Sequence, residues 1–408
     1  MGAFAKVGTE TVDLLETAGY MPFNCSLTGK KIVPALGAVY DSHVPPQNLK
    51  GAWYSRLGGD YLVVDGEDNV FLSVNGTNFL TVTNTSMSTP FLIESRDTGE
   101  YYAALCGDQL AILTRNTAVT SRIFTGGLSC GACKNGRLFG ADEADGLHLK
   151  WSGEGGLLDW QEGISGAGSA YLGSERGKIL RLFDYGGELV VLREFGITRM
   201  SVSGAPEKFA VKNNDVILPR VFKDSAVQLD GGIFFWTEKG PYIYRNGGIK
   251  AFTDPLVADV SEPKWAICTD GHTYILCAKS KSLERRAVYV FDSEGSGGYI
   301  IDIPANFVAG YEAPVAYADD CCYFIESAGK FTFASGGIFG DGKFRTMNRI
   351  EVDCDGAVDI EVSNGEVTRK ISGVKGFARI GLRGREFTVT LSADCEIRGA
   401  RVVAGGYA

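Results

Sequence analysis

Ten Asn-Gly or Asp-Gly dipeptides are distributed along this chain of 408 residues. Both central residues of a two-residue type I′ hairpin need a positive φ, and these dipeptides adopt it most readily. Several of them separate runs of strand-forming residues, as in residues 61–66 and 360–367. The sequence therefore predicts an all-β, antiparallel fold. The dipeptides begin at Asp65, Asn75, Asn135, Asp145, Asp230, Asn246, Asp270, Asp341, Asn364 and Asp355.

Short apolar strands recur just after turns, at intervals that are mostly about 40 to 50 residues, with one near 28. This is the period of a four-stranded propeller blade, which stacks against its neighbours to bury both of its faces. We expect an irregular β-propeller of six or seven blades over residues 45–335, with each of these runs as the second or third strand of its blade. A large β-sandwich is the alternative. The runs begin at residues 59, 107, 135, 186, 231, 271 and 319.

Both ends of the chain differ from this repeat. From about Arg345, apolar and polar residues alternate regularly, which predicts a small β-sandwich or closing sheet over residues 345–408, after a glycine-rich linker at 336–342. Residues 1–44 are expected to form an N-terminal arm. A short helix is predicted within it at residues 11–18, with Val12 and Leu15 on one side and Gly19 at its end.

Composition excludes several classes of protein. Charged residues make up 22 % and hydrophobic residues 45 %, as in globular proteins, and the net charge is −9. An acidic chain is poorly suited to grip nucleic acid, because binding relies on Lys and Arg at phosphates. No apolar run approaches a membrane span, and the first residues lack the apolar region of a signal peptide. We therefore interpret the ten scattered cysteines as mostly reduced, buried thiols of a protein made in the cytoplasm.

Two short motifs could carry chemistry. Residues 127–131 match the G-x-S-x-G pattern around Ser129, and His272 would be its base. That motif needs a helix after the serine, whereas a turn and a strand follow here. Cys130 and Cys133 have the spacing of a redox dithiol, but no helix follows them to lower a thiol pKa. We read them as ordinary small residues at a turn, with a disulfide or a metal site as the open alternatives.

Two loops resemble known binding motifs only partly. Residues 152–160 are loosely similar to the Asp-box turn of sialidase propellers, but Glu154 and Leu158 replace the expected Asp and Thr and Trp160 comes one residue late. Residues 173–178 are one residue short of a phosphate loop and lack its Ser or Thr. We therefore predict no catalytic, cofactor-binding or metal-binding residues, and we expect that the chain is not an enzyme. Arg383 and Arg385 are read as solvated, with an intersubunit ion pair as the alternative.

One longer region gives a more specific signal about the protein family than these short motifs do. A Trp-Ser strand leads to an Asp-Trp turn over residues 151–160, and hairpins rich in apolar residues follow at 177–200 and 231–244. Together with residues 377–391, this pattern resembles the tail hub or nozzle proteins of short-tailed phages, also called packaged-DNA stabilisation proteins. The likeness is strongest over about residues 145–250.

The resemblance implies a structural virion protein of a phage tail or neck, made in the cytoplasm of a host bacterium. Such proteins assemble as a homo-oligomeric ring, commonly a hexamer, below the portal and adaptor. They extend or close the channel through which genomic DNA leaves, and DNA passes through the lumen without sequence-specific binding. No cofactor is implied.

Two other functions remain open from the sequence. A carbohydrate-binding or glycoside-processing propeller would need some of its five tryptophans to line a groove, and a glycosidase would need two carboxylates in one cleft. A propeller that serves as a general interaction scaffold in a cell is the third reading.

Overall fold

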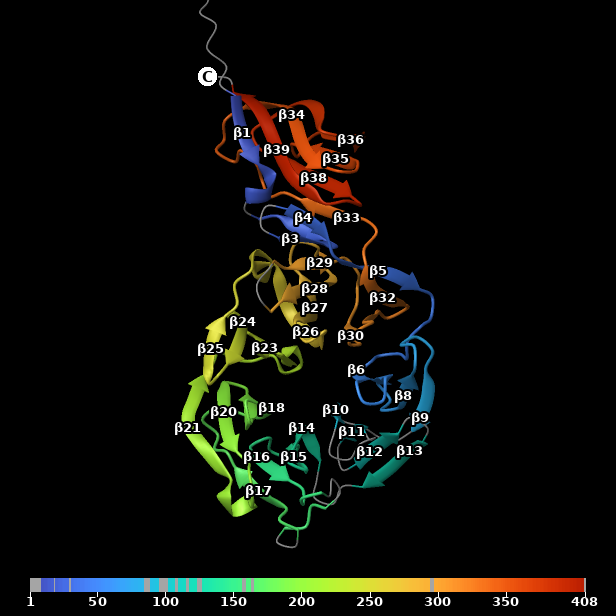
Figure 1. The fold of residues 1–408 in the computed structure, drawn as a ribbon, viewed down its shortest axis with the longest axis vertical. Helices are drawn as coiled ribbons and strands as arrows, with labels where there is room; N and C mark the ends of the chain where they lie inside the picture. Colours follow the sequence, from blue (N-terminus) through green and yellow to red (C-terminus); the bar gives the residue numbers. More distant parts are fainter. Residues whose placement is uncertain are drawn as a thin grey trace, which may run out of the picture.

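The computed structural model describes residues 9–17, 19–28, 31–83, 89–94, 102–106, 109–114, 117–122, 127–155, 159–162, 165–293 and 297–406. Strands dominate it, and helical structure among these residues is limited to short 3-10 turns. Seven antiparallel blades of four strands each surround a common centre, and a second β-body lies at one side of the ring (Figure 1). This arrangement confirms the prediction of an all-β propeller and rules out one large sandwich.

The blades follow one another along the chain. The first three are β6–β9 (Gly51–Ser55, Asp60–Val64, Val70–Ser73, Leu80–Thr83), β10–β13 (Phe91–Glu94, Tyr102–Cys106, Gln109–Thr114, Thr117–Arg122) and β14–β17 (Leu128–Lys134, Arg137–Asp142, His148–Trp151, Gly168–Tyr171). The next two are β18–β21 (Ile179–Tyr185, Glu188–Arg193, Gly196–Ser201, Ala210–Ile217) and β22–β25 (Val227–Leu229, Gly232–Thr237, Gly240–Arg245, Gly248–Ala251). The sixth is β26–β29 (Val260–Thr269, Thr273–Ser280, Arg286–Asp292, Tyr299–Ile301). The seventh begins with β30–β32 (Phe307–Ala309, Val315–Tyr317, Cys322–Ser327).

The N-terminal part of the chain completes the seventh blade. Strand β5 (Leu36–Asp41) pairs antiparallel with β32 and forms the outermost strand of that blade. At the centre, β30 lies against both β26 and β6, so the last blade contacts the first. Because the fourth strand comes from the other end of the propeller sequence, opening the ring between these blades requires breaking a whole strand ladder.

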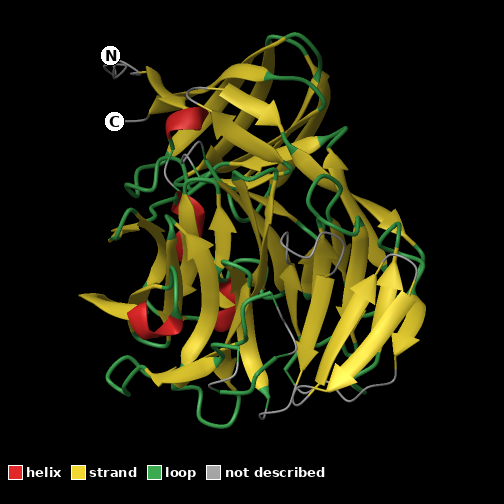
Figure 2. Cartoon of the chain, turned by 60° about the horizontal axis from the view of Figure 1, so that its bottom comes forward, coloured by secondary structure: helices red, strands yellow, loops and turns green. Residues whose placement is uncertain are grey.

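The second body is a β-sandwich built from both ends of the chain. One sheet contains β1 (Thr9–Asp13), β3 (Cys25–Thr28), β4 (Lys31–Pro34), β34 (Arg345–Cys354), β37 (Phe377–Gly384) and β39 (Ile397–Gly406). The other contains β2 (Met21–Phe23), β33 (Phe331–Ala334), β35 (Val358–Ser363), β36 (Thr368–Val374) and β38 (Thr388–Ala393). Thr9 of β1 lies opposite Gly405 of β39 in this body, which is at the top of the view in Figure 2.

A helix is predicted over residues 11–18, of which residue 18 lies outside the described residues. Residues 11–13 instead finish β1, and Leu14–Glu16 form a 3-10 turn. The Asp13 side chain caps that turn by accepting from the Leu15 N–H, and Leu14 and Leu15 are buried in the sandwich core. Pairing with β39 satisfies the backbone here, and it outweighs a weak local helix preference. The expected N-terminal arm, residues 1–44, is therefore not a separate unit. Strands β1–β4 belong to the sandwich and β5 to the propeller, while residues 1–8 lie outside the described residues.

The propeller and the sandwich share one continuous sheet. Strand β2 pairs in parallel with β29 of the sixth blade, with Phe23 opposite Ile300, and antiparallel with β33 on its other side. The Asn24 N–H donates to the Ile300 carbonyl over 2.9 Å and extends this ladder. The resulting nine-stranded sheet runs from β26 to β36.

Three of the ten dipeptides form the predicted turn, in which both central residues have a positive φ. Asn135, Asn246 and Asp270 have φ values of 50°, 49° and 51°, and the glycine after each also has a positive φ. These turns connect neighbouring strands within the third, fifth and sixth blades. The Asn or Asp of the other seven dipeptides has no positive φ, so the two-residue type I′ geometry is confirmed at these three positions and is wrong at the rest.

Candidate functional site

The G-x-S-x-G motif does not form a nucleophile elbow. Ser129 lies inside β14 and its carbonyl accepts from the Lys223 ammonium over 2.9 Å. His272 is exposed and pairs with Asp230, 3.7 Å away. The other two histidines, His43 and His148, pair with aspartates of their own turns. The motif thus lacks the strand–turn–helix context that would expose its serine.

Cys130 and Cys133 both belong to β14, where residues three apart point to opposite faces of the sheet. Burial raises the pKa of the Cys130 thiol, which keeps it protonated at neutral pH. No disulfide bond forms among the nine cysteines that the structure describes. The geometry therefore does not support a redox dithiol at these two positions.

We predict that native cysteines react slowly with iodoacetamide at pH 8. Burial raises the pKa of Cys25, Cys277 and Cys322 to about 12 and that of Cys268 to about 11. The thiolate is the reactive form, so these four should label about a hundredfold or more slowly than in guanidinium. Peptide mass spectrometry of the native and denatured protein measures this ratio. Equal rates in both states would contradict the buried positions.

In each of the two loops that resemble binding motifs, a buried arginine side chain donates hydrogen bonds to backbone carbonyls of the loop. The Arg137 guanidinium donates to the Ser152 and Gly166 carbonyls over 2.9 Å each and pairs with Glu154. The Asp-box-like turn is therefore fixed to its own blade. Arg193 fills the other loop, as described next.

Arg193 is 1 % exposed, and its guanidinium donates hydrogen bonds to the backbone carbonyls of three residues. It donates to Leu172 over 2.9 Å, to Gly173 over 2.5 Å, and to Gly177 over 2.6 and 3.1 Å. A phosphate loop presents N–H groups to its ligand, whereas residues 173–178 turn carbonyls toward an arginine. This loop is thus a structural cation site for Arg193 and not an anion cradle.

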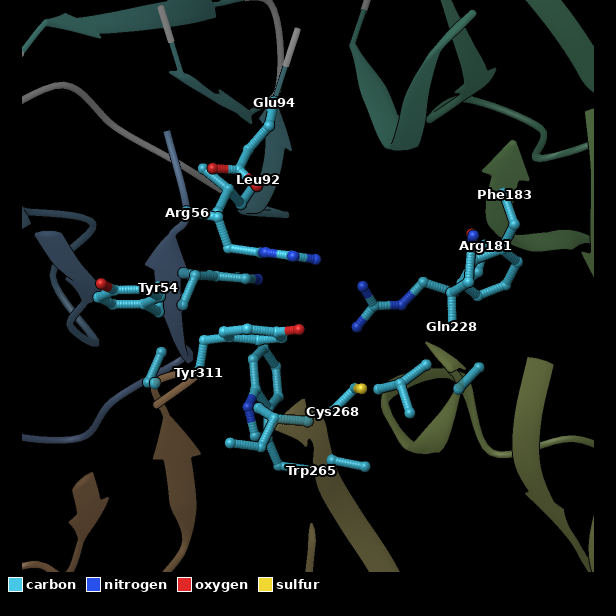
Figure 3. Close-up of a pocket in the computed structure, with 17 residues that line it drawn as sticks. Tyr54, Arg56, Leu92, Glu94, Arg181, Phe183, Gln228, Trp265, Cys268 and Tyr311 are labelled. Atoms are coloured by element: carbon cyan, nitrogen blue, oxygen red, sulfur yellow. The ribbon is translucent and has the colours of Figure 1, made fainter. Parts of the chain in front are cut away.

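A cavity of about 390 Å³ occupies the centre of the propeller (Figure 3). Its walls come from the innermost strands of six of the seven blades, or from the residues next to them, so the ring as a whole builds it. The lining combines aromatic and aliphatic side chains with a few polar groups, which is typical of small-molecule sites. The lining residues with functional groups are Trp53, Tyr54, Arg56, Glu94, Arg181, Gln228, Trp265, Cys268 and Tyr311.

Two arginines extend into this cavity from opposite sides (Figure 3). Arg56, directly after β6, places its guanidinium carbon 4.0 Å from the centre of the Tyr311 ring. Arg181, on β18, pairs with Asp224 over 3.1 Å. The Arg181 Nε atom is buried without a hydrogen-bond partner among the described residues. Each arginine thus has one contact that holds it in place and further donors that face the cavity.

The cavity lining also contains one carboxylate, which accepts hydrogen bonds from the protein, and one thiol, which is uncharged. Glu94 accepts hydrogen bonds from the Ser55 hydroxyl and the Leu57 N–H, both over 3.0 Å. Burial raises the pKa of Cys268 to about 11, so this thiol carries no charge at neutral pH. Arg56 and Arg181 are the two basic groups of this lining, and Glu94 is its carboxylate.

The tryptophans do not form an open sugar-stacking surface. Trp151, Trp160, Trp236 and Trp265 are at most 7 % exposed. Trp53 is half-buried and packs edge-on against Trp265 at 5.3 Å between ring centres. Sugar stacking needs an accessible aromatic face, so this placement does not favour the carbohydrate reading.

Within the described part of the chain, no three His, Cys, Asp or Glu side chains are grouped as a metal site would require. None of the helices described there has the length and apolar character needed to cross a membrane.

No protein-family model and no curated protein matches the chain. Among solved structures, the β-propeller domain of Cps50 (Swd1) from Myceliophteria thermophila is 10 % identical, covers 72 % of this chain and 99 % of that domain, and gives a TM-score of 0.49. The N-terminal domain of Nup159 is 11 % identical over 78 % of this chain and 97 % of that one, with a TM-score of 0.41. The strand pairing of the chain itself defines it as a β-propeller.

Proposed function

We propose that the chain is a structural, non-enzymatic protein of a phage tail or neck. It assembles as a homo-oligomeric ring, commonly a hexamer, that extends or closes the DNA exit channel below the portal and adaptor. The observation that carries this proposal is a pair of exposed apolar surfaces on opposite flanks of the propeller.

The first flank is formed by Val39 and Tyr40 of β5 and Leu80 of β9, the outermost strands of the seventh and first blades. Tyr40 is 64 % and Leu80 is 73 % exposed. The second flank is formed by Val211 and Ile217 of β21 and Ile249 of β25, on the fourth and fifth blades. Ile217 is 69 % exposed. Figure 1 shows β5 and β9 on the right side of the ring of blades and β21 and β25 on the left.

Two different apolar surfaces on opposite sides suit a head-to-tail contact between copies. Such a heterologous interface generates a closed ring when its rotation closes. Both flanks also lie on outermost strands, whose free backbone groups invite pairing with another chain. Large apolar side chains gathered at such edges are typical of interaction surfaces.

The charge distribution fits a wall past which DNA slides. Residues 35–330 carry 26 Lys and Arg against 36 Asp and Glu, a net charge of −10, while the remaining residues carry 14 against 13. Unneutralised phosphates are repelled by such a surface, so DNA would pass without adhering. A strongly basic lumen in the assembled ring would contradict this part of the proposal.

The first experiment measures mass by light scattering and shape by negative-stain microscopy, with and without the candidate portal–adaptor complex. We expect a closed ring, either alone or on that complex. A monomer that ignores the complex would overturn the proposal.

Substitutions on the two flanks test the ring geometry directly. Leu80→Glu and Ile217→Glu should each prevent ring closure, because each places a charge within one apolar flank. Mixing the two variants should give dimers and no rings, since each variant retains one intact flank of opposite type. Val367→Glu is the matched control, because Val367 is 49 % exposed on the sandwich. Rings formed by both flank variants would show that the contacts lie elsewhere.

A further inference from the structure

The cavity at the centre of the propeller has a property that ring assembly does not explain. Arg56 and Arg181 come from the first and fourth blades and direct their guanidinium groups toward one another (Figure 3). Like charges repel, and the repulsion grows where side chains and not water surround them. Asp224 beside Arg181 and Glu94 in the lining offset part of this repulsion, and an anion between the two guanidinium groups would be attracted by both of them.

We propose that this cavity binds a small organic dianion, whose two acidic groups are carboxylates or phosphates. One acidic group is bound by Arg56 and the other by Arg181. The inference does not rest on the proposed function, because the cavity lies within a single chain.

Arg56 is pre-positioned for this role. Its guanidinium lies over the Tyr311 ring, and in the described part of the chain this aromatic face, not a carboxylate, is the contact that holds it. Stacking on an aromatic ring leaves the N–H edge of a guanidinium available for hydrogen bonds in the ring plane. A planar fork of donors matches the two oxygens of a carboxylate or phosphate.

Arg181 is held differently but has unused donors. Asp224 accepts from its Nη2 atom over 3.1 Å, and its Nε atom is buried without a hydrogen-bond partner among the described residues. An unmet donor on a buried charged group is costly. A bound acidic group would accept from the guanidinium hydrogens that Asp224 leaves unused.

The rest of the cavity suits an organic molecule. Its volume of about 390 Å³ falls within the range of small-molecule sites. Phe183, Trp265 and Ile267 supply apolar surface for a carbon skeleton, and the exposed Gln228 amide adds a polar group at the wall. The neutral Cys268 thiol does not repel an anion. These features favour a carbon chain with acidic ends over a free inorganic ion.

The test is isothermal titration calorimetry on the whole chain at low ionic strength. The probes are succinate, glutarate and adipate, which differ in length, together with phosphoglycolate, inorganic phosphate and the monoanion butyrate. We expect at least one organic dianion to bind about tenfold or more tightly than butyrate, because it engages a second charged hydrogen-bonding group. The preferred length and acid type then identify the ligand class. Binding should also change tryptophan fluorescence, because Trp53 and Trp265 line the cavity.

Variants assign the binding to the two arginines. Arg56→Gln and Arg181→Gln should each weaken the best dianion about tenfold or more. Arg181→Lys keeps the positive charge beside Asp224, and it replaces Arg181→Gln in the binding measurement if Arg181→Gln does not fold. Arg349→Gln, on the sandwich, is the control and should leave affinity within about twofold, since surface charges far from a site are screened.

Three results would overturn the inference. They are the absence of binding by all three dicarboxylates and by phosphoglycolate, equal affinity for butyrate and the dianions, or unchanged binding in folded variants at both arginines. Binding of inorganic phosphate alone would also overturn it, because the cavity would then select an ion and not an organic dianion.

Discussion

Arg193→Ala is expected to lower the free energy of unfolding by about 3–5 kcal/mol. The substitution removes a buried charge and leaves the carbonyls of Leu172, Gly173 and Gly177 without their shared donor. Each unsatisfied buried acceptor adds a desolvation cost that the unfolded chain does not have. Arg193→Lys should recover only part of the loss, because one ammonium cannot reach all of these carbonyls in the geometry of a guanidinium.

Equilibrium unfolding in urea, followed by tryptophan fluorescence, measures this loss. Arg398→Ala is the matched control, because Arg398 pairs with Asp353 and Asp355 at the surface of the sandwich. Water replaces those partners readily, so the control should unfold almost as the unsubstituted protein does. Similar urea unfolding midpoints for Arg193→Ala and Arg398→Ala would show that Arg193 does not stabilise its loop.

Leu14→Ala is expected to destabilise the sandwich by about 2–5 kcal/mol. Leu14 is 0 % exposed and lies in the core that the C-terminal strands also form. Truncating it leaves a cavity that the surrounding sheets fill only in part. Near-UV circular dichroism and thermal unfolding would detect the change.

Thr11→Ala is the control for that substitution, because Thr11 is exposed on β1. It should leave the unfolding midpoint nearly unchanged. If Leu14→Ala were equally silent, residues 9–34 would have to be an arm that lies on the surface and not a part of the core.

Local signals in the sequence predicted the blades and three of the two-residue hairpin turns. A dipeptide such as Asn246–Gly247 determines its own turn, and the apolar run after a turn marks a strand within the same blade. Pairing between distant segments leaves no such signal. Thr9 lies opposite Gly405, and Leu36 lies opposite Ser327, so the roles of the N-terminal strands depend on partners hundreds of residues away. The helix prediction was wrong for the same reason, because residues 9–13 form a strand by pairing with the distant strand β39.

The central cavity was also hidden from sequence reasoning. Arg56 and Arg181 are 125 positions apart, and neither belongs to a recognisable motif. Their common environment arises because each stands on or beside an innermost strand. A useful signal would have been position within the repeat, since the cavity-lining residues lie on the first strand of a blade or next to it.

The sheet shared by propeller and sandwich has a mechanical consequence. Two chain segments cross between the bodies, and β2 lies parallel to β29 at the crossing. A pull on the sandwich along these strands loads their hydrogen bonds in shear, so the bonds must yield together and not one after another. A force applied to the sandwich would therefore reach the sixth blade through this sheet and through the two connecting segments.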